Sequence, residues 1–312
     1  MSSAAARAPR RPRGPRRAPV ERLRTVLAAR AGPAAADTLP DGYVRLGSVL
    51  LVRWPETLRP HFGPLSAALA EALGARSVLR VAGPVEGELR RPAVERLFGE
   101  ETETTVVEHG VRWRFDAARI MFAAGNRTER ARAGRLVRPG ETVVDLFAGI
   151  GYFAIPAAKV GRAARVVAVD RNPESVRYLR ENVRQNGVEG IVEIHCGDNR
   201  TIDLPTGLAD RVFLGYLPSA VPWIARALPL LRPGGGILHV HLVADARGAV
   251  PTAEAEVGAA VGAAGGVAVG PLRGRAVKPY GPGRTHVVVD APVRPGPGET
   301  AAGGGSAAGP TP

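Results

Sequence analysis

The stretch VVDLFAGIG at residues 143–151 decides how this chain is expected to fold. It begins as an apolar run typical of a buried strand, and Asp145 follows directly. Gly149 and Gly151 permit a tight turn and a close approach of the backbone to a ligand, because glycine has no Cβ. A helix is expected to begin near Tyr152. A strand, a glycine-rich turn and a helix in this order indicate a nucleotide-binding α/β domain.

Further apolar runs alternate with helical segments in the rest of this region. The expected strands are 142–147, 165–170, 191–195, 211–215, 236–243 and 286–290. The helix between the second and third strands is well marked, with Asn172 suited to the N-cap, Pro173 to the first turn and Gly187 to the end. This alternation predicts an α/β fold with a Rossmann-like, doubly wound sheet.

Acidic and amide side chains also stand at the ends of the second and third expected strands. Asp170 stands where a carboxylate can accept hydrogen bonds from both ribose hydroxyls of a nucleotide. Asp198 and Asn199 follow the third strand and could bind an adenine edge. The third glycine of the dinucleotide fingerprint is absent, since Ala154 occupies its place. The pattern therefore favours S-adenosylmethionine (SAM) over NAD as the ligand, and no metal is expected.

Composition divides the chain into four parts. We predict a basic, largely disordered arm at 1–37, a small α+β domain at 38–133, a SAM-binding catalytic domain at 134–292 and a disordered Gly/Pro tail at 293–312. In the small domain, strands are expected at 49–52, 78–81 and 111–115, and a helix at 64–73. Residues 1–31 hold nine arginines against one glutamate. Such an arm can bind RNA phosphates through its positive charge, or it can be merely disordered, and the sequence leaves these two alternatives open.

The overall composition excludes several classes of protein. With 312 residues and 45% hydrophobic content, the chain can build a sizeable core. Its single cysteine, Cys196, excludes an internal disulfide framework and a multi-cysteine zinc site. No apolar run reaches about 18 residues, and the N-terminus lacks the apolar segment of a signal peptide. A soluble, cytoplasmic protein is expected.

Further stretches carry a family resemblance that covers roughly residues 39–291. They are GEETET at 99–104, VEHGV at 107–111, FDAARIMFAAGNRTER at 115–130, DLFAGIGYF at 145–153, GDNR at 197–200, LGYLPS at 214–219, GILHVH at 236–241 and VKPY at 277–280. With these motifs the chain resembles the family of tRNA wybutosine-synthesising aminocarboxypropyltransferases and tRNA guanine-N1 methyltransferases. The resemblance implies a class I SAM-dependent transferase with a smaller N-terminal α+β domain.

Two places distinguish the branches of this family. The methyltransferases carry Asn-Leu-Pro after the fourth strand, where this chain has Tyr216-Leu217-Pro218. They also tend to have an arginine where this chain has Gly125-Asn126. Both differences favour transfer of the 3-amino-3-carboxypropyl group, with methylthioadenosine as the leaving group. The sulfonium activates three adjacent carbons, so the position of the acceptor selects which of them reacts.

The resemblance also implies roles for individual residues. Arg130 would bind the methionine carboxylate, and Ala123 stands in the same binding stretch, where relatives often have serine. The full expected cofactor-binding set is Ala123, Arg130, Asp145, Phe147, Gly149, Gly151, Asp170, Asp198 and Asn199. Asp198 or Tyr216 could assist deprotonation of the acceptor and are the catalytic candidates. The histidines at 195, 239, 241 and 286 are expected to be structural, with those at 239 and 241 on opposite faces of their strand.

The identity of the acceptor is open between several hypotheses. The main prediction is the phenol of a small secondary metabolite, as in isonocardicin synthase of β-lactam antibiotic biosynthesis. Its grounds are an arginine-rich composition that looks bacterial and the modest charge outside the arm. The alternative is the same transfer to a modified guanine in tRNA. Methylation of guanine N1 in tRNA is a second alternative, and a non-catalytic RNA-binding protein that keeps SAM as a ligand is a third.

Overall fold

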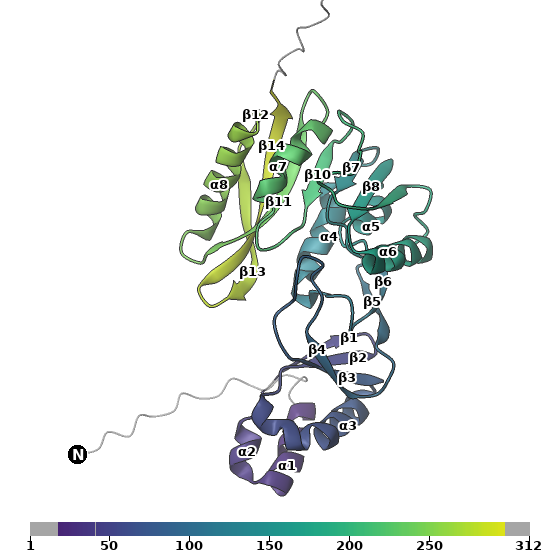
Figure 1. Cartoon of the computed structure of the whole chain (residues 1–312), viewed down its shortest axis with the longest axis vertical. Coiled ribbons are helices and arrows are strands. Elements are labelled where there is room, and N and C mark those ends of the chain that lie inside the picture. The colour runs from purple at the N-terminus through teal and green to yellow at the C-terminus, as the bar shows by residue number, and fades with distance from the viewer. Residues whose placement is uncertain (1–17, 41, 297–312) are drawn as a thin grey trace, which may run out of the picture. The chain divides into compact units, whose positions relative to one another are not determined.

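The computed structural model describes residues 18–40 and 42–296, which form two compact units (Figure 1). The described residues up to Val107, together with Trp113–Ala124, make up unit 1. Unit 2 comprises Glu108–Arg112 and the residues from Gly125 onward. The predicted boundary after residue 133 falls inside helix α4 (Arg127–Leu136), which belongs to unit 2. Within the described ranges, no helix is long and apolar enough to cross a membrane.

Unit 1 is built around a small mixed sheet in the order β1-β2-β3-β4, in which only β2 and β3 are parallel. Strands β5 and β6 form a separate two-stranded sheet. The elements up to the end of unit 1 are α1 (Ala18–Ala31), α2 (Pro33–Asp37), β1 (Tyr43–Leu46), β2 (Val49–Val52), η1 (Glu56–His61), α3 (Phe62–Leu73), β3 (Ser77–Val81), β4 (Val94–Phe98), β5 (Glu103–Glu108), β6 (Val111–Asp116) and η2 (Ala124–Asn126). The predicted strands 49–52, 78–81 and 111–115 and the predicted helix are present, whereas β1, β4 and β5 were missed.

The prediction of a largely disordered arm over 1–37 is wrong for residues 18–37, which form α1 and α2. Val20, Leu23 and Leu27 of α1 are buried in the same apolar cluster as residues of α3. These three side chains are spaced three and four residues apart, so they share one face of the helix. The density of arginines suggested disorder, but Arg22 and Arg30 simply lie on the exposed side. Residues 1–17 lie outside the described residues.

Unit 2 is a doubly wound α/β sheet in the order β12-β14-β11-β10-β7-β8-β9, with β13 paired to β14. Strands β9, β8, β7, β10 and β11 are parallel, and β14 is antiparallel to β11. The elements after α4 are β7 (Thr142–Asp145), α5 (Ala154–Lys159), β8 (Arg165–Asp170), α6 (Pro173–Gln185), β9 (Val192–Cys196), β10 (Arg211–Leu214), η3 (Val221–Trp223), α7 (Ile224–Ala227), η4 (Leu228–Leu230), β11 (Gly236–Asp245), α8 (Ala249–Ala263), β12 (Gly266–Ala268), β13 (Arg273–Gly281) and β14 (Arg284–Pro295).

The predicted class I fold is confirmed, and its six expected strands are β7, β8, β9, β10, β11 and β14. Strand β14 runs to Pro295, so the predicted tail from 293 begins too early; residues 297–312 lie outside the described part. The β13 strand was missed because its Gly- and Pro-containing sequence lacks an apolar alternation. The chain passes from β7 outward to β9 and then returns to the other side of β7 as β10. Ligands of such sheets bind at the carboxyl ends of the strands beside this switch point.

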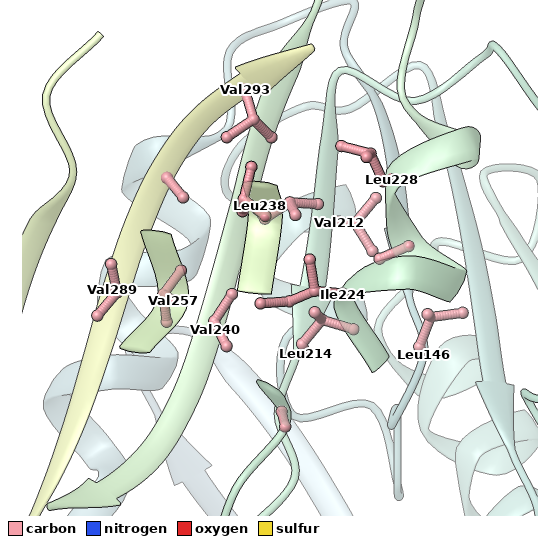
Figure 2. Packing of buried hydrophobic residues seen from close by; sticks show 14 of the residues in the cluster. Leu146, Val212, Leu214, Ile224, Leu228, Leu238, Val240, Val257, Val289 and Val293 are labelled. Atoms are coloured by element: carbon pink, nitrogen blue, oxygen red, sulfur yellow. The ribbon is translucent and has the colours of Figure 1, made fainter. Parts of the chain in front are cut away.

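The two faces of the sheet in unit 2 are covered by different layers. One face packs against α7 and α8 through a continuous apolar cluster that includes Leu146, Leu214 and Val240 (Figure 2). On the other face, Phe213 stacks on His239 and on Phe153. His241 also contacts Phe153, so His239 and His241 share a face. The expectation that they point to opposite faces is wrong, because residues two apart on a strand point the same way.

His241 and His286 form a buried pair in this second layer. Their rings are joined by a hydrogen bond of 2.9 Å between Nδ1 of His241 and Nε2 of His286. Burial, together with the charges of Lys278 and Arg275, lowers the pKa of His286 from 6.5 to about 4. Between pH 6.5 and pH 4, this imidazole is protonated in the unfolded chain but neutral in the folded protein. The folded protein therefore loses stability relative to the unfolded chain as the pH falls from 6.5 towards 4.

We expect His286→Gln to remove the loss of stability that protonation of His286 causes between pH 6.5 and pH 4. The variant loses packing and the hydrogen bond to His241, so it is less stable than the wild type at pH 7. The difference in free energy of unfolding between the two proteins should shrink by about 3 kcal/mol between pH 7 and pH 4, since each pKa unit corresponds to about 1.4 kcal/mol. Urea unfolding at both pH values measures this change. A difference that stays constant with pH would contradict the assignment.

Candidate functional site at the carboxyl edge of the sheet

A glycine-rich loop connects β7 to α5 at the switch point. Gly149 and Gly151 adopt φ angles of 55° and 101°, which favour glycine. A Cβ added at Gly149 would lie 2.6 Å from the Tyr152 ring, and one added at Gly151 would lie 2.4 Å from Cδ1 of Ile155. A side chain at either position would have to displace the ring of Tyr152 or the side chain of Ile155. The tight turn therefore depends on glycine at both positions.

Asp145 stabilises this loop through hydrogen bonds to its backbone. Its carboxylate is fully buried and accepts hydrogen bonds of 3.2 Å from the backbone N–H groups of Phe147 and Ala154. Burial, with a smaller contribution from the charge of Asp170, raises the pKa of Asp145 to about 7. Asn182 of α6, which the sequence analysis missed, donates a 3.1 Å hydrogen bond to the carbonyl of Ile150. The hydrogen bonds from Phe147 and Ala154 connect Asp145 to both ends of the loop, and its contact with SAM stays a prediction.

Asp170 ends β8 and lies against the same loop. Its Oδ2 accepts a 2.7 Å hydrogen bond from the N–H of Gly149, and its Oδ1 accepts one of 2.9 Å from Asn172. Burial raises the pKa of Asp170, although both hydrogen bonds oppose that shift. A carboxylate has about four acceptor sites, so these two bonds leave capacity for a diol. The geometry suits the predicted contact with ribose hydroxyls.

Asp198 and Asn199 follow β9, as predicted, but their side chains already have partners. Arg200 binds the carboxylate of Asp198 through Nε and Nη2, with a shortest distance of 2.6 Å. The hydrogen bonds from the Arg200 side chain and backbone lower the pKa of Asp198 to about 2. Asp198 is thus anionic and a weak base at neutral pH. Its contact with adenine and its catalytic role stay predictions.

Asn199 is almost completely buried. Its Nδ2 donates a 2.7 Å hydrogen bond to the carbonyl of Leu146, and its Oδ1 accepts one of 2.9 Å from the indole N–H of Trp223. The side chain therefore joins the end of β7 to the segment after β10. A contact between Asn199 and adenine stays a prediction.

Three partly exposed rings meet beside this point. Phe147 lies 5.1 Å from Tyr216 and 5.2 Å from Trp223, and Tyr216 lies 5.1 Å from Trp223, between ring centroids. We call these three residues the aromatic triangle. Phe147 and Tyr216 were predicted for the site, and the structure brings them together. Trp223 was missed, because nothing in its local sequence distinguishes it from an ordinary core residue.

Arg130 of α4 is buried and forms an ion pair. Its Nε and Nη2 each donate a hydrogen bond of 2.9 Å to the carboxylate of Glu108. Burial lowers the pKa of Arg130 and the charge of Glu108 opposes this. The sequence analysis did not foresee this partner. Binding of a methionine carboxylate by Arg130 stays a prediction, as does the role of Ala123, which belongs to unit 1.

The residues present fit SAM. The glycine loop offers the tight turn of a nucleotide-binding domain, Asp170 offers acceptors for a ribose, and the aromatic triangle offers apolar and π surface. Together with the strand order of unit 2, this edge defines a SAM-dependent transferase of the class I fold.

Comparisons with known proteins identify the family. The TRM5/TYW2 methyltransferase domain matches residues 104–256, and the TYW2 N-terminal domain matches residues 23–102. A Pyrococcus horikoshii protein named tRNA(Phe) (4-demethylwyosine(37)-C(7)) aminocarboxypropyltransferase is 35% identical over 270 residues, which are 86% of this chain and 95% of that protein. The chain belongs to the TRM5/TYW2 family, and it is a SAM-dependent transferase of the 3-amino-3-carboxypropyl group.

Solved structures agree with this assignment. The crystal structure of P. horikoshii TYW2 in complex with MeSAdo has a TM-score of 0.76 and 31% identity, and the match covers 88% of this chain and 99% of that one. The structure of M. jannaschii TYW2 in complex with AdoMet has a TM-score of 0.65 and 29% identity, with 81% and 100% covered. The small phenolic acceptor and the link to antibiotic biosynthesis expected from the sequence find no support in these similarities.

Proposed function

We propose that this protein transfers the 3-amino-3-carboxypropyl group of SAM to a modified guanine in tRNA, in a wybutosine-type modification. The observation that carries the proposal is the similarity over nearly the whole of the P. horikoshii aminocarboxypropyltransferase, whose name specifies C7 of 4-demethylwyosine in tRNA(Phe). Tyr216-Leu217-Pro218 in place of the methyltransferase tripeptide supports the same branch. The tRNA acceptor thus replaces the small phenol as the favoured reading, with a cytoplasmic location.

The transfer is a nucleophilic substitution at a carbon. A bond forms between the acceptor atom and the γ-carbon of the methionine arm while the bond from that carbon to sulfur breaks. The electron pair stays on sulfur, methylthioadenosine leaves, and the acceptor loses a proton. The sulfonium supplies the leaving group, so the protein has mainly to hold the two reactants in line.

The chain's own residues suit this positioning role. In this proposal Asp170 holds the ribose, and the aromatic triangle flanks the methionine arm and the planar acceptor. Asp198, with a pKa of about 2, contributes negative charge rather than proton abstraction at neutral pH. Tyr216 is the remaining candidate for contact with the acceptor proton.

Analysis of the nucleoside product tests the proposal. The purified full chain is incubated with SAM and either tRNA(Phe) carrying 4-demethylwyosine or a small-molecule extract, and the products are identified by mass spectrometry. We expect methylthioadenosine only with tRNA, with the acceptor nucleoside gaining one aminocarboxypropyl group. Methylthioadenosine formed only with the small-molecule fraction would restore the phenol hypothesis. S-adenosylhomocysteine would mean that the protein transfers methyl groups.

A further inference from the structure

Trp223 occupies a central place at the site, although no motif singled it out. It ends the short helix η3, in the segment that follows β10 and the Tyr216 loop. Its ring touches both Phe147 and Tyr216, and its N–H donates to Asn199. It therefore contacts residues of the loops after β7, β9 and β10.

Hydrogen bonds and a ring contact link these residues in a closed circuit that begins and ends at Trp223. Trp223 donates to Asn199, Asn199 donates to the carbonyl of Leu146, and Leu146 precedes Phe147, whose ring packs edge-on against Trp223. Arg226 strengthens the same link with hydrogen bonds of 3.0 Å to the carbonyl of Asn199 and 2.6 Å to that of Ile202. The orientation of the loop after β9 therefore depends on the segment that carries Trp223.

We propose that Trp223 is a positioning residue that couples the two sides of the transfer. Through its N–H it fixes Asn199 and the carbonyl of Leu146, at the edge where the adenosine part of SAM is expected. Through its ring it fixes Phe147 and Tyr216, next to the reacting carbon and the acceptor. The acceptor side of this inference rests on the proposed function, whereas the cofactor side rests on the class I site alone.

The two contributions can be separated by two substitutions. Trp223→Phe retains a six-membered aromatic ring but removes the N–H together with the five-membered ring of the indole, so the buried Oδ1 of Asn199 loses its donor. We expect the Kd of SAM to rise about ten-fold, as is typical when a buried polar atom is left unpaired. At saturating SAM, kcat with tRNA should fall by less than this factor, because an aromatic ring is still present. Trp223→Ala also removes the ring, and kcat with tRNA should fall at least about ten-fold further.

A double-substitution cycle distinguishes positioning from a general loss of packing. If Trp223 acts on the cofactor through Asn199, then Trp223→Phe should have no further effect on the Kd of SAM in an Asn199→Ala background. Trp54→Phe, which alters a buried tryptophan of unit 1, is the matched control and should leave the Kd unchanged. Calorimetric titration with SAM, with thermal melting of each variant, gives these values.

Three results would overturn the inference. The first is an unchanged Kd of SAM for Trp223→Phe. The second is a double variant whose Kd is raised by the product of the factors for Trp223→Phe and Asn199→Ala, and the third is a loss of activity that merely follows the unfolded fraction. SAM binding is measured without an acceptor. Failure of the proposed function, seen as no methylthioadenosine with tRNA in the wild type, is therefore distinguishable from failure of the role of Trp223.

Discussion

Asp170→Ala is expected to raise the Kd of SAM by at least about a hundred-fold. The substitution removes the proposed acceptor for the ribose hydroxyls and also releases the N–H of Gly149, which donates to Asp170 over 2.7 Å. Hydrogen bonds to a charged group contribute about 1.5–3 kcal/mol each, so the loss of two or more corresponds to a factor of a hundred or greater. Binding of methylthioadenosine should fall equally, since it has the same ribose.

The stability of the same variant should change much less than its affinity. Burial raises the pKa of Asp170, which means that the fold disfavours the ionised carboxylate. Loss of the charge therefore offsets part of the cost of the two broken hydrogen bonds. Calorimetric titration measures the affinity, and urea unfolding measures the stability. Asp203→Ala, which removes an exposed acid in the loop after β9, is the matched control. A Kd for Asp170→Ala within three-fold of the wild type would refute the ribose contact.

The parts of the site that the sequence predicted are those fixed by local structure. Strands β7, β8 and β10 are continuous apolar runs, so their ends, and the carboxylate of Asp170 at one of them, could be located from the sequence. Asn172 caps α6 as expected, accepting a 3.0 Å hydrogen bond from the N–H of Glu174. A residue whose position follows from its neighbours along the chain is visible in a single sequence.

The parts that were missed depend on contacts between distant positions. Arg130 and Glu108 are 22 residues apart, and Trp223 and Asn199 are 24 apart, so neither pairing follows from a local pattern. Helix α1 was missed for a different reason, because composition outweighed the spacing of Val20, Leu23 and Leu27. Composition also favoured the phenolic acceptor, although net charge and amino-acid composition carry little information about the shape of a site.

Arg130→Ala is expected to lower the free energy of unfolding by about 3–5 kcal/mol. Arg130 is only 2% exposed and Glu108 8%, and removing one member of a buried ion pair leaves the other charge uncompensated. The double variant Arg130→Ala with Glu108→Ala should recover part of this loss, because it removes the stranded carboxylate as well. Urea unfolding of the wild type, the two single variants and the double variant gives the coupling energy. Additive effects would show that the pair does not stabilise the fold.

The same variants test whether Arg130 also binds the methionine carboxylate. Under conditions in which Arg130→Ala remains folded, a direct contact predicts that the affinity for SAM falls more than that for methylthioadenosine, which has no carboxylate. We expect this difference to reach about ten-fold, the effect of one charge-assisted hydrogen bond. Glu108→Gln serves as the control, because it keeps the guanidinium while weakening its internal partner. An equal loss for both ligands in Arg130→Ala would confine Arg130 to the ion pair and assign the carboxylate to another residue.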